Sequence, residues 1–229
     1  MMKPLTMNRR ESAAVTLVVG MLCPAALFVL CWWASAALAI YGLLPLPEWS
    51  IAAAALSGLG AGLILDLLFL RRWASSFYAW DYKLLVPLYL FGSAVAVAWF
   101  MGFPLGNVTW GTLAGVYVGR KQHHEAASPS AARQAIRRVG TFTAVVTGLE
   151  ALPIGLMALN EGIAVRTIQA VTGLDQQTIA GPFGVAMVIV LCLLLMGLQW
   201  WCTTSAARIA LSRSGAAIST TESRPGGVE

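Results

Sequence analysis

Long runs of apolar residues, separated by short polar segments, dominate the pattern along this chain. A helix needs about 20 mostly apolar residues to cross about 30 Å of hydrocarbon, and six runs approach or exceed that length. They lie at about residues 13–43, 50–70, 84–103, 105–119, 139–159 and 182–204. The pattern predicts an all-α polytopic integral membrane protein, a bundle of six transmembrane helices within residues 1–219. Residues 220–229 are polar and predict a disordered cytoplasmic tail.

The first run is longer than one straight span requires. About 31 residues make about 46 Å of helix, and Pro24 is the predicted position of a kink. A secretory signal peptide is the alternative, because residues 1–10 are basic and residues 37–39 resemble a cleavage site. The apolar part of a signal peptide spans only about 7–15 residues, so we expect a retained helix.

Composition agrees with a membrane protein. Hydrophobic residues make up 58% of the 229 residues and charged residues 11%, and the mean hydropathy is +0.73. Average soluble domains carry about 25% charged residues. So few charges cannot cover the surface of a soluble protein of this size, which disfavours soluble enzymes and DNA-binding domains. The expected partner is the lipid bilayer, and no nucleic acid is expected despite the net charge of +5.

The basic residues predict the orientation. With six spans, all but one of the 15 Lys and Arg residues fall on one side, and Arg166 alone falls on the other. Cytoplasmic loops are enriched in Lys and Arg, so both termini are predicted to be cytoplasmic. The expected location is a membrane that borders the cytoplasm, the bacterial inner (plasma) membrane.

Two rows of small residues recur at four-residue spacing. One row is Gly111, Gly115 and Gly119, and the other contains Gly58 and Gly62. Such rows let helix backbones approach closely in lipid, where there is little hydrophobic drive for helices to associate. The favoured interpretation is packing within the chain, and the alternative is a pore lining or a contact between subunits.

Two acidic residues lie inside the apolar runs. Glu150 is near the middle of the fifth run. Pro153, the predicted position of a second kink, cannot donate a hydrogen bond to the carbonyl of Leu149. A carboxyl group beside a free carbonyl suits a cation, a proton or a polar substrate group. The alternative is a neutral Glu150 that bonds another span as a packing device. Asp66, near the inner boundary, either serves the inner mouth of a path or pairs with Arg71.

The start of the fourth run is also polar. Asn107 and Thr109 follow Pro104 and Gly106, which indicates either irregular backbone lining an aqueous cavity or an ordinary turn with an Asn cap. His123 and His124 lack a third and a fourth ligand, so no metal site is expected. Neither a cofactor nor a common hydrolase or nucleotide-binding motif is indicated.

These observations favour a small channel or transporter for a small solute or ion, coupled to protons or cations through Glu150. A homo-oligomer or a complex with a partner subunit is compatible with the glycine rows. The second hypothesis is a non-catalytic accessory or assembly subunit, in which the acids act as hydrogen-bonding groups between helices. The third, less favoured, is a lipid-modifying enzyme in which Asp66 or His124 acts beside Arg71, Arg72 and Arg120.

Overall fold

The structure is a computed structural model that describes residues 9–99, 105–160, 165–166, 169–170, 173, 175, 179 and 181–222. Every regular element in these ranges is helical, in agreement with the predicted all-α class. The elements are α1 (Arg9–Ile40), α2 (Glu48–Ser76), the 3-10 helix η1 (Phe77–Ala79), α3 (Tyr82–Trp99), α4 (Leu105–His124), α5 (Pro129–Asn160) and α8 (Pro182–Glu222).

Five of these helices are long and apolar enough to cross a membrane, namely α1, α2, α3, α5 and α8. The fourth predicted segment, residues 105–119, forms α4, which is not among the five. Its 20 residues include four glycines and end in the polar run Arg120–His124, which lowers its hydropathy. The predicted tail differs in one respect, because α8 continues through residue 222, and residues 223–229 lie outside the described part.

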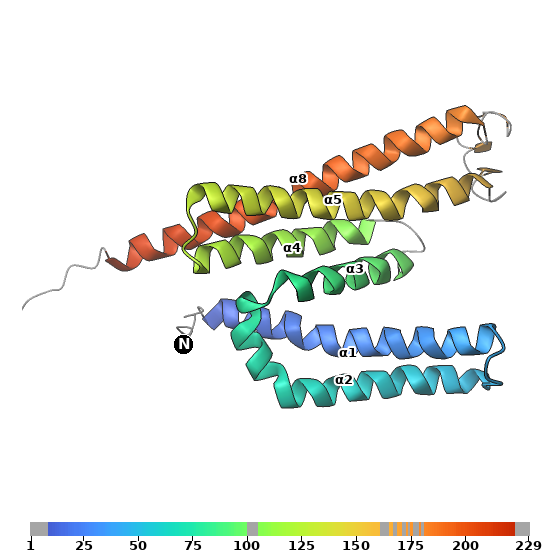
Figure 1. Cartoon of the computed structure of the whole chain (residues 1–229), viewed down its shortest axis with the longest axis horizontal. Helices are drawn as coiled ribbons and strands as arrows, with labels where there is room; N and C mark the ends of the chain where they lie inside the picture. The colour runs from blue at the N-terminus through green and yellow to red at the C-terminus, as the bar shows by residue number, and fades with distance from the viewer. Residues whose placement is uncertain are drawn as a thin grey trace, which may run out of the picture. The chain divides into compact units, whose positions relative to one another are not determined.

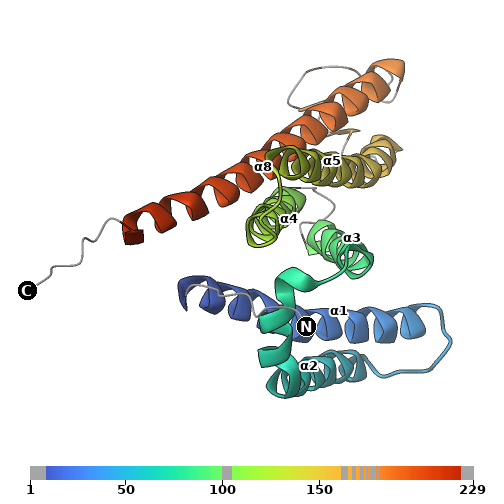
Figure 2. The same ribbon diagram turned by 60° about the vertical axis from the view of Figure 1, so that its left-hand side comes forward.

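The helices form two compact units, residues 1–81 and residues 82–229. In the first unit, α1 and α2 pack along each other as a helical hairpin (Figure 1). In the second unit, α4 packs against α8, α5 and α3, and α5 also packs against α8 (Figure 2). Thus α4, the least apolar of these helices, is surrounded on several sides by its neighbours.

Small residues bring the two helices of the first unit together. A Cβ atom added to Gly62 would overlap the backbone of Pro24, and one added to Gly58 would overlap the carbonyl of Leu27. The proline on α1 and the glycine row on α2 therefore face each other. Because a glycine presents no side chain, the α2 backbone can lie directly against α1.

The glycine row of α4 has the same role against α8. A Cβ on Gly115 would overlap the backbone carbonyl of Thr203, and one on Gly119 would overlap that of Ala207. Gly111 lies against the side chains of Gln199 and Thr203. The three glycines therefore line a contact within one chain, where two helix backbones meet.

The start of α5 is defined by a local cap. Ser128 precedes Pro129, and the Ser128 hydroxyl accepts a hydrogen bond from the Ala131 N–H at 3.3 Å. Proline suits the first helical position because its missing N–H would have no partner there. The predicted fifth span, residues 139–159, is therefore the later part of a 32-residue helix.

The α4–α8 contact leads to a stability prediction. We expect Gly115→Ala to lower the free energy of unfolding by about 1–3 kcal/mol, because the new methyl group meets backbone that has little room to move. Thermal unfolding of the detergent-purified protein measures the effect.

Gly197→Ala on α8 is the matched control, because nothing lies within 4 Å of the added Cβ. Replacing a helical glycine there should leave stability unchanged or raise it by up to about 1 kcal/mol. Equal stability of both variants would contradict the tight contact at Gly115.

Candidate functional site

Glu150 joins three helices of the second unit. Its Oε2 atom accepts a hydrogen bond from the Ser93 hydroxyl of α3 at 2.8 Å and another from the Asn107 side-chain amide of α4. Ser93 and Asn107 are fully buried, whereas Glu150 is half-buried. The carboxyl group predicted to be the main site therefore lies at the edge of the helix bundle and is held from inside it.

The hydrogen bonds continue from Asn107 to α8. The Gln199 amide donates to the backbone carbonyl of Asn107 at 3.0 Å and lies 3.5 Å from the Thr203 hydroxyl. The hydroxyls of Thr203 and Thr143 are 3.0 Å apart, and Thr143 also bonds the Gly140 carbonyl. We call these linked residues the buried polar cluster: Ser93, Asn107, Thr143, Glu150, Gln199 and Thr203.

Several polar atoms in and beside this cluster have no hydrogen-bond partner. They are Asn107 Oδ1, Gln199 Oε1 and Thr147 Oγ1. The Tyr89 hydroxyl lies within hydrogen-bonding reach of the Gln199 side chain. Thr147 lies on the same face of α5 as Thr143 and Glu150, one turn from each. A buried polar group without a partner costs several kcal/mol in hydrocarbon, or about 1–3 kcal/mol in a protein interior. The cluster is therefore incomplete by itself.

A groove reaches the cluster from outside. It has a volume of about 410 Å³ and runs between α3 and α5, lined by Ala94, Val97, Ala98, Leu149, Glu150, Pro153 and Ile154. Glu150 is the one charged residue among them. Because Pro153 lacks an N–H, the Leu149 carbonyl on this wall misses its normal helical donor. The groove is thus apolar except for two acceptors, the Glu150 carboxyl group and the Leu149 carbonyl.

The other predicted polar residues do not belong to this cluster. Thr109 lies on the exposed side of α4, and no hydrogen bond joins it to the described part of the chain. Asp66 is in the first unit, 6% exposed, with its Oδ2 atom 4.0 Å from the position that a Cβ on Gly20 would take. Its Oδ1 atom has no hydrogen-bond partner. Asp66 therefore faces α1.

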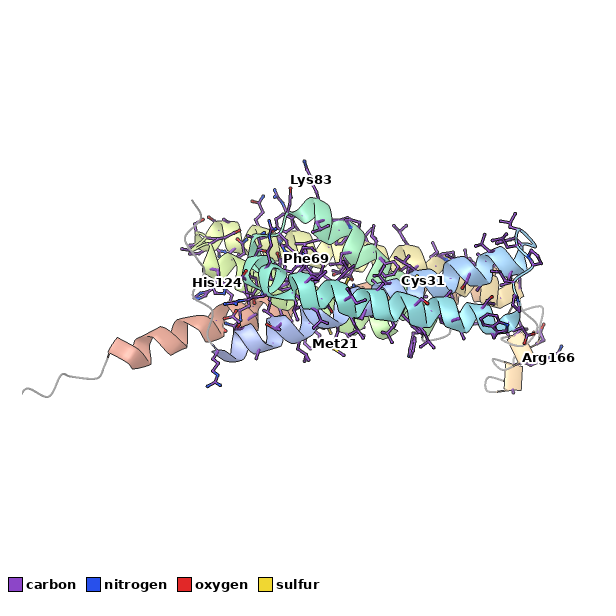
Figure 3. The ribbon with its side chains drawn as sticks, turned by 90° about the horizontal axis from the view of Figure 1, so that it is seen from below. Met21, Cys31, Phe69, Lys83, His124 and Arg166 are labelled. Carbon is purple, nitrogen blue, oxygen red and sulfur yellow. The ribbon has the colours of Figure 1, made fainter. Side chains whose placement is uncertain are left out.

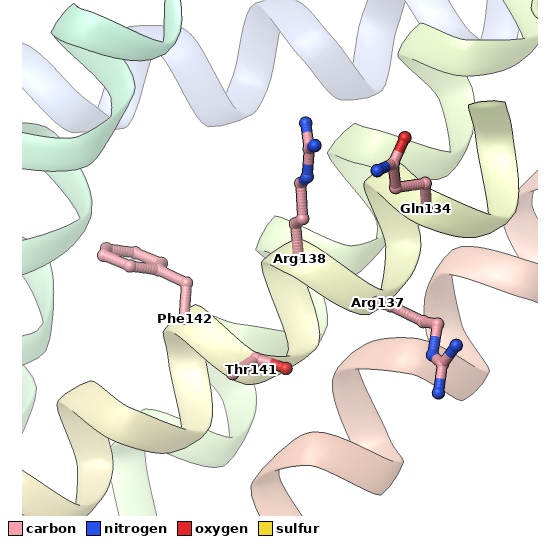
Figure 4. Close-up of a pocket in the computed structure, with 5 residues that line it drawn as sticks. All are labelled: Gln134, Arg137, Arg138, Thr141 and Phe142. Atoms are coloured by element: carbon pink, nitrogen blue, oxygen red, sulfur yellow. The ribbon is translucent and has the colours of Figure 1, made fainter.

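Two adjacent arginines of α5 do not converge on one ligand position. A hollow of about 550 Å³ on α5 is lined by Gln134, Arg137, Arg138, Thr141 and Phe142. Figure 4 shows that Arg137 and Arg138 leave the helix in different directions, so their guanidinium groups do not point at one ligand position. In the described residues, no three His, Cys, Asp or Glu side chains form a group that could hold a metal ion.

Some polar residues of this region were not predicted from the sequence, although their spacing along the helices could have indicated them. On α5, Thr143, Thr147 and Glu150 are spaced i, i+4 and i+7, and on α8 Gln199 and Thr203 are spaced i, i+4. These spacings place polar groups on one helix face within otherwise apolar runs. Ser93, an isolated serine in an apolar run, carries no such signal.

Comparisons with known proteins give no functional assignment. No protein-family model, no curated protein and no solved structure matches this chain. Function is therefore inferred from the residues of the site itself.

The link between Glu150 and Asn107 can be measured by a double-mutant cycle. Glu150→Ala and Asn107→Ala should each destabilise the protein, and the double variant should lose less than their sum by about 1–3 kcal/mol. The coupling is expected because the first substitution already removes the shared hydrogen bond.

Ser128→Ala combined with Asn107→Ala is the control cycle. Ser128 caps α5 beyond the far end of α4, so the two losses should add within about 0.5 kcal/mol. Coupling of Asn107 to Glu150 no larger than this would argue against the bond.

Proposed function

We propose that this chain is a small integral membrane channel or transporter, and that its second unit binds a small solute or ion at Glu150. The observation that carries the proposal is the position of this carboxyl group. It lies where an open groove between α3 and α5 meets the buried polar cluster. Ionisable groups within membrane spans mark substrate and ion pathways more often than they mark simple packing.

The unpartnered atoms favour binding over packing alone. A polar network that only holds helices together is most stable when each member is satisfied, because a half-satisfied network costs more than an apolar core. Here two amide oxygens and the Thr147 hydroxyl are left over near one carboxyl group. A solute that supplies the missing hydrogen bonds would complete the network.

The proposed topology has six spans with both termini in the cytoplasm of a bacterial cell, and α4 is the sixth spanning helix. Its contacts with α3, α5 and α8 support this placement, since a less apolar helix can span when neighbours shield it from lipid. Figure 3 shows His124 at one end of the second unit and Arg166 at the other. His124 follows Arg120 and Lys121 on α4, whereas Arg166 is the one basic residue predicted on the other side of the membrane. Their opposite positions agree with the proposed orientation.

An accessory or assembly subunit is the second candidate. Glu150 already receives two hydrogen bonds from neighbouring helices, which is what a packing role requires. Large apolar side chains are also exposed on α8, including Leu193 and Leu194 at 60% and 65%. Lipid or another membrane subunit would cover that surface.

Flux measurements distinguish the two candidates. In liposomes that contain the purified protein, at least one solute from a panel of small ions and neutral molecules should cross faster than in empty liposomes. Glu150→Gln should reduce that flux at least about tenfold, because it removes the charge while keeping the size of the side chain.

Glu48→Gln is the matched control for this test. Glu48 is exposed at the start of α2 and makes no interaction with the described residues, so the same chemical change should leave the flux unchanged. Equal flux in Glu150→Gln and the parent would rule out the role of Glu150. Absence of flux for every solute would favour the accessory subunit.

Cysteine labelling tests the topology. In a background without Cys23, Cys31, Cys192 and Cys202, an impermeant thiol reagent added to spheroplasts should label Arg166→Cys. It should label Glu125→Cys only after the membrane is opened, because these two positions lie on opposite sides in the proposed arrangement. The reverse result would invert the topology.

A further inference from the structure

We propose that the buried polar cluster, together with the neighbouring Thr147 on α5, binds a small monovalent cation, an alkali-metal ion or ammonium, through the free oxygens of Asn107, Gln199 and Thr147 beside Glu150. This inference deepens the proposed function and rests on it for the role of the cation as the transported species. Alkali-metal ions and ammonium share one requirement, a set of oxygen acceptors with a single balancing negative charge.

The directions of the hydrogen bonds within the cluster leave mainly acceptor atoms available to a ligand. Ser93 and Asn107 both donate to Glu150, and Gln199 donates to the Asn107 carbonyl. Thr143 donates to the carbonyl of Gly140, so the proton between Thr143 and Thr203 comes from Thr203. Most donors of the cluster are therefore used within it. The free positions are two amide oxygens, which only accept, and the Thr147 hydroxyl, whose oxygen can accept or bind a cation.

The orientation of both side-chain amides follows from their partners. The Asn107 amide end that faces Glu150 must be the NH₂ group, because a carboxylate only accepts. The Gln199 end that faces the Asn107 backbone carbonyl must be NH₂ for the same reason. The opposite end of each amide is therefore a carbonyl oxygen, which cannot donate. A ligand there has to be a cation or a hydrogen-bond donor.

The charged residues around the cluster favour a ligand with a single positive charge. Residues 84–99, 105–119, 139–160 and 182–207 contain Glu150 as their single acidic residue and no Lys, Arg or His. An anion would meet a carboxyl group and carbonyl oxygens with no compensating cation. A calcium ion takes about 6–8 oxygen ligands and usually several carboxylates, which this cluster does not offer.

Burial favours a ligand that has lost most of its water. Asn107 and Gln199 are 0% exposed and Thr147 is 1% exposed, so their oxygens would replace water around the ion. Potassium channels use carbonyl oxygens in this way. The groove of about 410 Å³ opens to the surface at Glu150, the one cluster member that lines it, so an ion can approach the cluster on this side.

Thermal unfolding at constant ionic strength tests the inference without depending on flux. The purified protein is titrated with NaCl, KCl or NH₄Cl, each replacing N-methyl-D-glucamine chloride, whose cation is too large for the cluster. At least one small cation should raise the unfolding temperature in a saturable way, because it binds the folded protein. The cation with the lowest half-saturating concentration identifies the preferred species.

Thr147→Val assigns the binding to the cluster. The variant keeps the shape of the side chain but removes an oxygen, so the half-saturating concentration should rise about tenfold. Thr147→Ser keeps the hydroxyl and should retain the parent value. The matched control is Thr112→Val on α4, whose hydroxyl bonds the Val108 carbonyl of its own helix. It should also retain the parent value.

The outcomes separate this inference from the proposed function. No stabilisation by any of the three small cations would overturn the cation site, and flux of a neutral solute would then still support transport. Saturable stabilisation without any flux would support the site and overturn the transport role. Stabilisation that is unchanged in Thr147→Val would show that the cation binds elsewhere and would overturn the assignment to this cluster.

Discussion

The hydrocarbon core of a membrane contains almost no water, so every polar atom there depends on the protein for its hydrogen bonds. The helices satisfy this requirement for most of the backbone, and it determines where the side chains of Ser93, Asn107 and Gln199 can lie. They meet at the centre of the second unit because a lipid-facing position would leave them without partners. The same constraint makes the atoms that remain unpartnered the most informative feature of the molecule.

Close backbone contact is what brings these side chains together. Gly111 stands where a larger residue would displace the Gln199 amide, and Gly115 lets the α4 backbone reach the Thr203 carbonyl. The amide of Gln199 can then bond the Asn107 carbonyl across the α4–α8 contact. The packing row and the polar cluster are therefore parts of one interface. Weakening the first should also separate the groups of the second.

The apolar runs predict the helices well, because hydropathy and length are local properties of the sequence. They predict the ends less well, since α5 begins at Pro129, where Ser128 caps it, and α8 continues to Glu222, beyond its apolar part. Glu150 and Asn107 are recognisable as polar residues in apolar surroundings. Their pairing with Ser93 depends on which helix faces which, and a single sequence does not carry that information. The same holds for the α1-facing position of Asp66.

The hydrogen bonds that meet at Asn107 have a mechanical consequence. Its side chain holds the carboxyl group at the groove, and its backbone carbonyl holds α8 through Gln199. One residue at the start of α4 thus has two attachments, one to a carboxyl group at the groove and one to α8, the helix against which α4 packs most extensively. A shift of the start of α4 would therefore move the carboxyl group at the groove and the Gln199 contact at the same time.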